Sequence, residues 1–265
     1  MSATLSVVVP SLNQGHFIGE TLDSILNQSG AEVEVIVVDG GSTDGTLDVL
    51  RGYGSRIAWT SERDGGQSEA INKGLRAARG EIVCYLNSDD IFEPGALAHV
   101  AGYFDRHQDV AWAFGRCRII DARGAQTRSL VEGYKTAWAR YARGRGSLLV
   151  LNYIPQPATF WRASAMARVG PLDESLHYAM DYDFWLRLAT LGAPGFIDRY
   201  LASFRLHDGS KTLNGARKQL AEACGIAKAH GAGLSLPLHR MHDWATLLTY
   251  NARYDQAIGP ASSRA

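Results

Sequence analysis

Apolar runs rich in Val and Ile alternate with segments of helical periodicity along the first hundred residues. The runs are apolar at consecutive positions, which favours strands buried on both faces of a parallel sheet. The helical segments carry apolar residues three and four positions apart, as helices that cover a sheet do. The predicted strands are 5–9, 33–38, 57–60 and 82–86, and the predicted helices are 16–28, 43–50 and 67–78.

This alternation predicts an α/β fold with a mostly parallel, doubly wound sheet and helices on both faces. The rhythm changes after residue 105, where we expect short antiparallel additions and a C-terminal helical segment. No repeat or low-complexity linker interrupts the chain, so one continuous domain is predicted, with about the last ten residues frayed. The later predicted elements are strands at 110–114, 118–120, 158–161, near Phe196 and at 201–206, and helices at 181–191, 214–230 and 239–251.

The composition narrows the function classes without choosing one. The chain has 265 residues, is 46% hydrophobic and carries a formal net charge of zero, which is typical of a soluble globular protein. A nucleic-acid binder would normally carry a basic excess, so that class is disfavoured. The three cysteines show no metal-binding or disulfide spacing. No signal peptide or membrane-spanning run is recognisable, and a cytoplasmic protein is expected.

Polar, glycine-rich or acidic sequence follows each of the first four predicted strands. Parallel strands end at one edge of a sheet, where ligands bind in open α/β folds, so these segments should meet. Each segment alone is also good turn or helix-capping chemistry, and that interpretation stays open. The segments are Pro10 to Asn13, Asp39 to Thr46, Glu62 to Gln67 and Asn87 to Asp90.

Together the four segments favour a nucleoside-diphosphate site. Asp39 could accept hydrogen bonds from a base or a ribose. Asp89 and Asp90 could hold Mg²⁺ or Mn²⁺, which prefer oxygen ligands and would bridge the diphosphate. The cation would explain why two adjacent carboxylates are tolerated. No dinucleotide-binding or P-loop glycine pattern is present.

Two later motifs could complete a catalytic site. Asp181 and Asp183 precede the apolar face of a predicted helix, where Asp181 is either a helix cap or a general base. The segment FRLHDGSKT, residues 204–212, offers His207 and Lys211 to phosphates, or is an ordinary surface loop.

Six motifs in register resemble the inverting glycosyltransferases of family two, which have the GT-A fold. They are VVVPSLNQ, EVIVVDGGSTDGT, ERDGGQSEAINKG, YLNSDD, MDYDFWLRL and FRLHDGSKT, spread over residues 5–212. The resemblance implies a GT-A domain at 1–212, with a nucleotide-sugar half at 1–105 and an acceptor half at 106–212. Residues 213–265 would be a helical extension packed on it.

The resemblance also implies roles for individual residues. Asp181 aligns with the catalytic base. Asp89, Asp90 and His207 would hold the divalent metal. Two departures are Asn87, where the family has the first acid of its metal motif, and Met180, where it often has Glu. The donor-binding residues implied are Pro10, Asn13, Asp39, Asp64, Gly65, Gly66, Asn72, Asn87, Ser88, Asp89 and Lys211.

The implied reaction is a single displacement that transfers a hexosyl or deoxyhexosyl group from a nucleotide sugar, UDP- or dTDP-linked, in cell-envelope glycan assembly. Gln156, Trp161 and Asp183 are candidates for the acceptor pocket, although Trp161 is also a plausible core residue. The basic and aromatic stretch 133–146 predicts either a membrane-surface helix or a solvated helix with buried aromatics. With membrane contact, the acceptor would be a lipid-linked glycan at the inner face of the cell membrane.

Two other functions remain as alternatives. A nucleotidyltransferase that forms sugar nucleotides would show a basic glycine-rich loop after the first strand, where this chain has PSLNQGHF. A non-catalytic nucleotide-sugar binding module would fit Asn87 and Met180, but it would not need Asp39, Asp89, Asp90 and Asp181.

Overall fold

The fold is described from a computed structural model, which covers residues 3–127 and 130–239. One eight-stranded sheet runs through it in the order β3-β2-β1-β4-β7-β6-β8-β5. The strands are β1 (Leu5–Ser11), β2 (Val33–Asp39), β3 (Ala58–Ser61), β4 (Ile82–Tyr85), β5 (Ile91–Phe92), β6 (Trp112–Ile120), β7 (Thr159–Arg162) and β8 (Gly195–Arg205).

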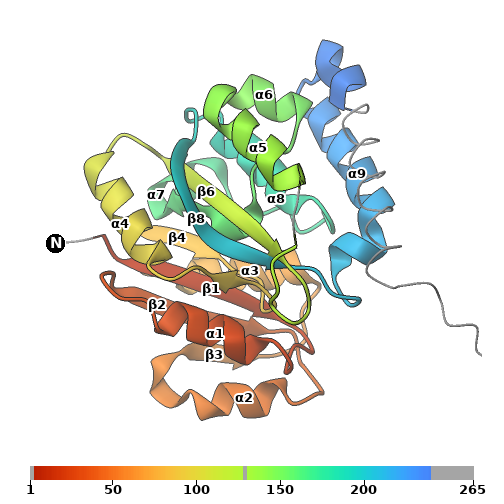
Figure 1. The fold of residues 1–265 in the computed structure, drawn as a ribbon. Helices are drawn as coiled ribbons and strands as arrows, with labels where there is room; N and C mark the ends of the chain where they lie inside the picture. Colours follow the sequence, from red (N-terminus) through yellow and green to blue (C-terminus); the bar gives the residue numbers. More distant parts are fainter. Residues whose placement is uncertain (1–2, 128–129, 240–265) are drawn as a thin grey trace, which may run out of the picture.

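The helices cover this sheet and lie around it (Figure 1). Those of the first half are α1 (Ile18–Leu26), α2 (Thr46–Gly52), α3 (Gln67–Ala77) and α4 (Ala96–Arg106). Those of the second half are α5 (Leu130–Tyr141), α6 (Arg145–Val150), α7 (Ala163–Val169), α8 (Met180–Leu188) and α9 (Lys211–Ala229). Short 3₁₀ turns lie at η1 (Gly54–Arg56), η2 (Gln156–Ala158) and η3 (Gly233–Ser235).

The first four strands are parallel neighbours, so their carboxyl ends lie at one edge. β1 pairs with both β2 and β4, and β2 pairs with β3, all in parallel register. The central strands are buried along their whole length, as consecutive apolar positions predict. α3 packs directly on β1, where a side chain on Gly74 would collide with Val8. The predicted parallel core is therefore confirmed.

Antiparallel strands join this core to the second half of the chain. β7 lies between β4 and β6 and pairs antiparallel with both, while β8 runs parallel to β6. The short strand β5, which the sequence did not predict, pairs antiparallel with the far side of β8. The single sheet therefore crosses the boundary expected near residue 105.

Several predicted elements differ from the observed ones. The strands at 110–114 and 118–120 are one strand, β6, and those near Phe196 and at 201–206 are one strand, β8. Irregular pairing around Gly115 and Arg116 bends the β6–β8 ladder without ending it, as a β-bulge does. The stretch 133–146 belongs to two helices, α5 and α6, separated by Gly144 with φ 138°.

The C-terminal part is described only to residue 239. The predicted helix at 214–230 is part of α9, which packs against α8. The predicted helix at 239–251 and the frayed last residues lie outside the described part of the chain. No helix in the described residues is long and apolar enough to cross a membrane.

Candidate active site

A cavity of about 530 Å³ opens at the carboxyl ends of the parallel strands. Ligand pockets of this size are typical for small molecules and cofactors. One side is lined by the ends of β1 and β4 and the loop into α3. The other side is lined by β6, β8, α5 and the segment that leads into α8. The two halves of the chain therefore build one site.

Nine of the predicted site residues line this cavity. They are Pro10, Asp64, Gly66, Asn87, Ser88, Asp89, Gln156, Asp181 and Lys211. Gly65 lines a smaller pocket of about 210 Å³, which shares Gly66, Gln67 and Lys211 with the first. The edge of the sheet thus collects the polar strand-end segments, as the parallel topology predicts.

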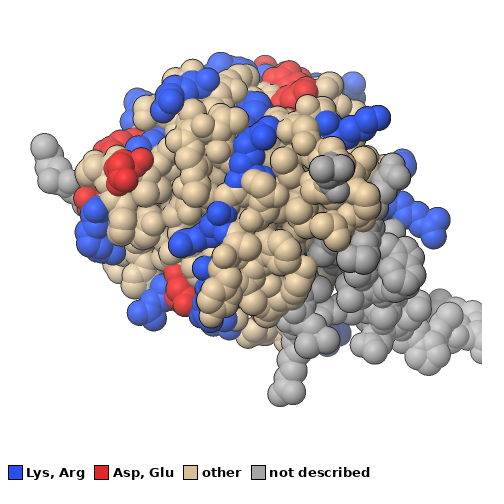
Figure 2. All heavy atoms as spheres, turned by 90° about the horizontal axis from the view of Figure 1, so that it is seen from above, with Lys and Arg blue, Asp and Glu red and all other residues tan. Residues whose placement is uncertain are grey.

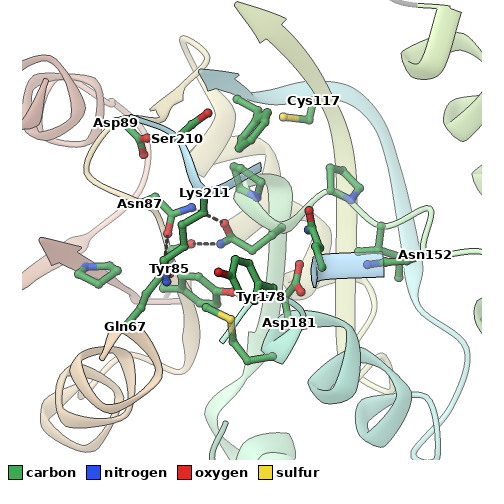
Figure 3. Close-up of a pocket in the computed structure, with 18 of the residues that line it drawn as sticks. Gln67, Tyr85, Asn87, Asp89, Cys117, Asn152, Tyr178, Asp181, Ser210 and Lys211 are labelled. Atoms are coloured by element: carbon green, nitrogen blue, oxygen red, sulfur yellow. Dashed lines mark hydrogen bonds between the residues drawn. The ribbon is translucent and has the colours of Figure 1, made fainter. Parts of the chain in front are cut away.

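A chain of side-chain amides crosses the cavity between these elements (Figure 3). Lys211 Nζ donates to Gln67 Oε1 at 2.7 Å, and Gln67 Nε2 donates to Asn87 Oδ1 at 2.7 Å. Asn87 Nδ2 in turn donates to Gln156 Oε1 at 3.1 Å, and Gln156 Nε2 donates to the Tyr85 carbonyl at 2.8 Å. Asn87 therefore has a structural reason to be an amide, because it both donates and accepts.

Asp89 and Asp90 have different surroundings although they are neighbours. Asp89 lines the cavity, and its Oδ2 lies 2.9 Å from His207 Nε2. Asp90 is fully buried, accepts hydrogen bonds from the Arg205 backbone N–H and from Asn87, and does not line the cavity. Burial and the adjacent Asp89 charge raise the pKa of Asp90 well above its ordinary value. In the described structure the Asp90 carboxylate is therefore directed to Arg205 and Asn87, away from the cavity lining.

Asp89 and His207 are the two predicted metal ligands whose side chains contact each other. A carboxylate oxygen and an imidazole nitrogen within 2.9 Å of each other suit a divalent cation. Among the described residues, no group of three or more His, Cys, Asp or Glu side chains could hold a metal ion. Two protein ligands are fewer than a divalent cation takes, so an ion held by this pair would need its remaining ligands from phosphate and water.

Three side chains predicted to bind the sugar donor form hydrogen bonds within the protein instead. Asp39 is fully buried and accepts hydrogen bonds from the backbone N–H groups of Gly41 and Ser42 and from two serine hydroxyls. Asn13 Oδ1 accepts from the Thr43 N–H at 2.9 Å. Asn72 is buried and holds the backbone of Leu172 through both its N and O atoms. None of the three lines the cavity.

Two predicted acceptor residues are also placed elsewhere. Trp161 is fully buried and packs its ring on Phe184 and Trp185, so it is a core residue. Asp183 pairs with Arg187 at 2.8 Å and with His230 at 2.8 Å, away from the cavity lining. Gln156 is the predicted acceptor residue that does line the cavity.

Asp181 is the carboxylate that α8 presents to the cavity (Figure 3). Burial raises its pKa to about 6, while the Tyr182 backbone N–H and the charge of Lys135 act in the opposite direction. The segment before α8 is held by Glu222 of α9, which accepts hydrogen bonds from the backbone N–H groups of residues 177–179. A fixed carboxylate with this pKa is ionised at neutral pH and can accept a proton.

Sequence reasoning missed several cavity residues, among them Gln67, Tyr85, Lys135, Asn152 and Tyr178. Gln67 belongs to a strand-end motif and was recognisable from it. Lys135 lies within the stretch 133–146, which the sequence predicts to be either a membrane-surface helix or a solvated helix with buried aromatics. Nothing local indicates that its side chain turns inward.

The basic side chains of that stretch are mostly directed to the protein. Lys135 lines the cavity, Arg140 pairs with Asp198 at 2.7 Å, and Arg145 donates to the His230 carbonyl at 2.7 Å. Tyr134 and Tyr141 are exposed. On the face seen in Figure 2, Lys and Arg lie apart rather than in one continuous surface.

The chain is similar to known glycosyltransferases. A profile described as "Glycosyl transferase family 2" matches residues 6–174. An uncharacterized glycosyltransferase of Rickettsia typhi is 29% identical over 83% of this chain and 69% of that protein. A PGL/p-HBAD biosynthesis glycosyltransferase of Mycobacterium bovis is 29% identical over 74% of this chain and 73% of its own length. Chondroitin synthase of Escherichia coli is 29% identical, but the chain spans only 30% of it.

Solved structures share the fold. S. aureus TarS 1–349, in complex with UDP-GlcNAc, matches with a TM-score of 0.64 at 21% identity, over 84% of this chain and 65% of that one. The mannosyltransferase PcManGT from Pyrobaculum calidifontis, in complex with GDP-Man and Mn²⁺, matches with a TM-score of 0.63 at 19% identity, over 97% and 81%. The GT-A fold that the motifs imply is confirmed, and the profile match shows that the chain belongs to glycosyl transferase family 2.

Proposed function

We propose that this glycosyltransferase moves a sugar from a nucleoside-diphosphate donor to an acceptor hydroxyl in one displacement, with inversion and with a divalent metal. The observation that carries the proposal is the shared cavity. It brings Asp89, from the strand-end edge, and Asp181, from α8, into one space of about 530 Å³. A donor-side carboxylate and a base on the acceptor side are what such a displacement needs.

The donor would lie along the ends of β1 and β4, with its diphosphate near Asp89 and Lys211. Asp89 and His207 would hold the metal, which when bound supplies positive charge to the leaving diphosphate. Lys211, at the start of α9, already reaches over this edge to Gln67. Its ammonium would pair with a phosphate oxygen of the donor.

Asp181 would act as the general base. An acceptor hydroxyl loses its proton to the Asp181 carboxylate as its oxygen attacks the anomeric carbon. The bond from that carbon to the diphosphate breaks on the opposite face, and its electron pair leaves with the nucleoside diphosphate. Because there is one attack from one face, the anomeric configuration inverts.

Asp39 has a revised role in this proposal. Its carboxylate fixes the turn after β2 through backbone and serine donors. It would therefore shape the nucleotide-binding edge, with direct contacts coming from cavity-lining groups such as Pro10, Ser11 and Asp64.

The nucleotidyltransferase alternative has less support. The cavity lining contributed by the end of β1 is Pro10, Ser11, Leu12 and Gln14, with no cation in that segment. The basic side chains of the described lining, Arg116, Lys135 and Lys211, come from the second half of the chain. A non-catalytic module would not need a buried, proton-accepting Asp181 beside the donor edge.

The test is a thermal-shift screen of UDP-, dTDP- and GDP-sugars and the free diphosphates, each with and without Mn²⁺. A ligand that binds the folded state raises the melting temperature by mass action. We expect at least one nucleotide sugar to stabilise the wild-type protein, with a larger shift when Mn²⁺ is present. If no nucleotide shifts the transition with or without metal, the proposed donor site does not exist.

A further inference from the structure

The half of the cavity under α5 has a different lining from the donor edge. Its walls combine apolar and polar side chains from β6, β8, α5 and the segment before η2. The apolar residues are Phe114, Ile119, Ala139, Ile154, Phe196 and Phe204. Lys135 of α5 and Asn152 belong to the same half, which we call the α5 lobe.

Lys135 is a basic side chain of the α5 lobe. In the described parts of the chain its ammonium has no hydrogen bond and no ion pair, although it shares the cavity with Asp181. Two other charged residues of the cavity lining, Arg116 and Glu132, each have a hydrogen-bond partner in the protein. Arg116 donates to the Tyr200 hydroxyl at 2.6 Å, and Glu132 accepts from the Ile119 N–H at 2.8 Å.

Burial makes this arrangement costly for the protein on its own. Loss of water lowers the pKa of Lys135, and the charge of Asp181 partly offsets that effect. A cation in an apolar lobe gains most from a ligand that brings an anion, because the pair then shares the loss of hydration.

A second polar group in the α5 lobe also lacks a partner. Asn152 Oδ1 is buried and accepts no hydrogen bond in the described structure. It lines the same side of the cavity as Asp181 (Figure 3). A carbonyl oxygen of this kind accepts a hydroxyl hydrogen, which is what a sugar ring offers.

We propose that the α5 lobe binds an amphipathic acceptor that carries a phosphate or carboxylate near its nucleophilic hydroxyl, with Lys135 pairing with that anion and Asn152 accepting from a second hydroxyl. This inference rests on the proposed function, because it names the acceptor class for the same site. Lys135 is then the residue that selects anionic over neutral acceptors. The apolar walls contact the remainder of the acceptor.

Three probes with the same ring and the same chain test the inference. They are octyl β-glucoside, its 6-phosphate and octyl β-glucuronide, titrated by calorimetry below their micellar concentrations. The protein is first saturated with Mn²⁺ and UDP, so that the diphosphate position is filled, and the titrations are repeated without them. The variants are Lys135→Met, which keeps the length of the side chain, and Lys135→Arg, which keeps the charge. Lys218→Met, at an exposed position of α9, is the control for the charge change.

We expect wild type, Lys135→Arg and Lys218→Met to bind an anionic probe about tenfold more tightly than the neutral one, a difference of about 1.4 kcal/mol, because the anion forms a charge-assisted hydrogen bond with the cation at position 135. Lys135→Met should lose that preference and bind the neutral probe as wild type does. The tighter of the two anionic probes identifies the phosphate or the carboxylate. The inference is overturned if wild type shows no anionic preference, or if Lys135→Met keeps it. Nucleotide-induced thermal shifts on the same samples report separately on the donor site.

Discussion

At the residue scale, two pairs of nearby carboxylates have different surroundings and therefore different expected roles. Asp181 and Asp183 are two residues apart on α8, so they lie on different helix faces. Asp181 lines the cavity, whereas Asp183 is bound by Arg187 and His230. Helical geometry alone predicts that only one of these two carboxylates can reach the cavity. The packing of α8 decides which of the two carboxylates that is.

The surroundings of Asp181 predict an unusual pH dependence of stability. Its pKa in the folded state, about 6, lies above the ordinary value of 3.8, so the folded protein binds this proton more tightly than the unfolded chain does. The resulting stabilisation is complete below the ordinary value and is lost as pH rises through about 6. Above that pH, Asp181→Asn should therefore be more stable than wild type, by on the order of 1–3 kcal/mol.

Urea unfolding of both proteins at pH 4 and pH 8 checks this expectation. The advantage of Asp181→Asn should be small at pH 4 and larger at pH 8, with equal slopes against urea. An advantage that stays constant over this range would mean that the carboxylate is not destabilised by burial.

The second pair, Asp89 and Asp90, should separate by substitution. Asp89→Asn removes the cavity carboxylate beside His207 and should abolish the extra stabilisation that Mn²⁺ gives to nucleotide binding. Asp90→Asn should keep that metal effect, because Asp90 faces Arg205 and Asn87 rather than the cavity.

Thermal shifts with a nucleoside diphosphate, with and without Mn²⁺, measure both variants. The assignment fails if Asp90→Asn loses the metal effect while Asp89→Asn retains it.

At the scale of elements, the turns after the strands explain why some predicted ligand residues are structural. A polar residue at a strand end can serve the turn or a ligand, and the sequence pattern is the same for both. Asp39 and Asn13 bind the backbone of the turn that follows β2. Asp64 and Asn87 face the cavity. The topology predicted where the site lies, but the backbone of each turn decided which side chains reach it.

Helix α9 holds the segment that leads into α8, and a substitution in α9 can test this role. Glu222 accepts hydrogen bonds from three consecutive backbone N–H groups, of residues 177–179, just before α8 begins. Glu222→Ala leaves these donors unsatisfied and should lower the free energy of unfolding by about 1–3 kcal/mol. Because Asp181 is the second residue of α8, transfer should slow more than nucleotide binding weakens.

The measurements are the melting temperature, the rate of nucleoside diphosphate release and the nucleotide Kd. Lys218→Ala, on an exposed position of the same helix, is the matched control and should resemble wild type. An unchanged melting temperature in Glu222→Ala would show that α9 does not anchor this segment.

At the scale of the whole molecule, the sequence predicted the first half well and the second half only in part. β1 to β4 are buried parallel neighbours whose apolar runs, turns and helices follow one local rule. β5 to β8 pair with strands far away in the chain, and only this pairing defines their extent. The motifs predicted that the ends of β1 and β4 and Asp181 belong to one site, and all of them line the same cavity. The inward direction of Lys135 and the core position of Trp161 depend on long-range packing, which no local pattern contains.

The central claim is that Asp181 serves the chemical step and not the binding of the donor. The most direct measurement is nucleoside diphosphate release from the best donor of the screen by wild type, Asp181→Asn and Asp183→Asn, with nucleotide Kd on the same samples. We predict that Asp181→Asn loses roughly a hundredfold or more in rate, the usual contribution of a general base, while its Kd stays near that of wild type. Asp183→Asn should retain the transfer rate of the wild type, measured under conditions in which the variant is folded. Wild-type turnover in Asp181→Asn would contradict the account.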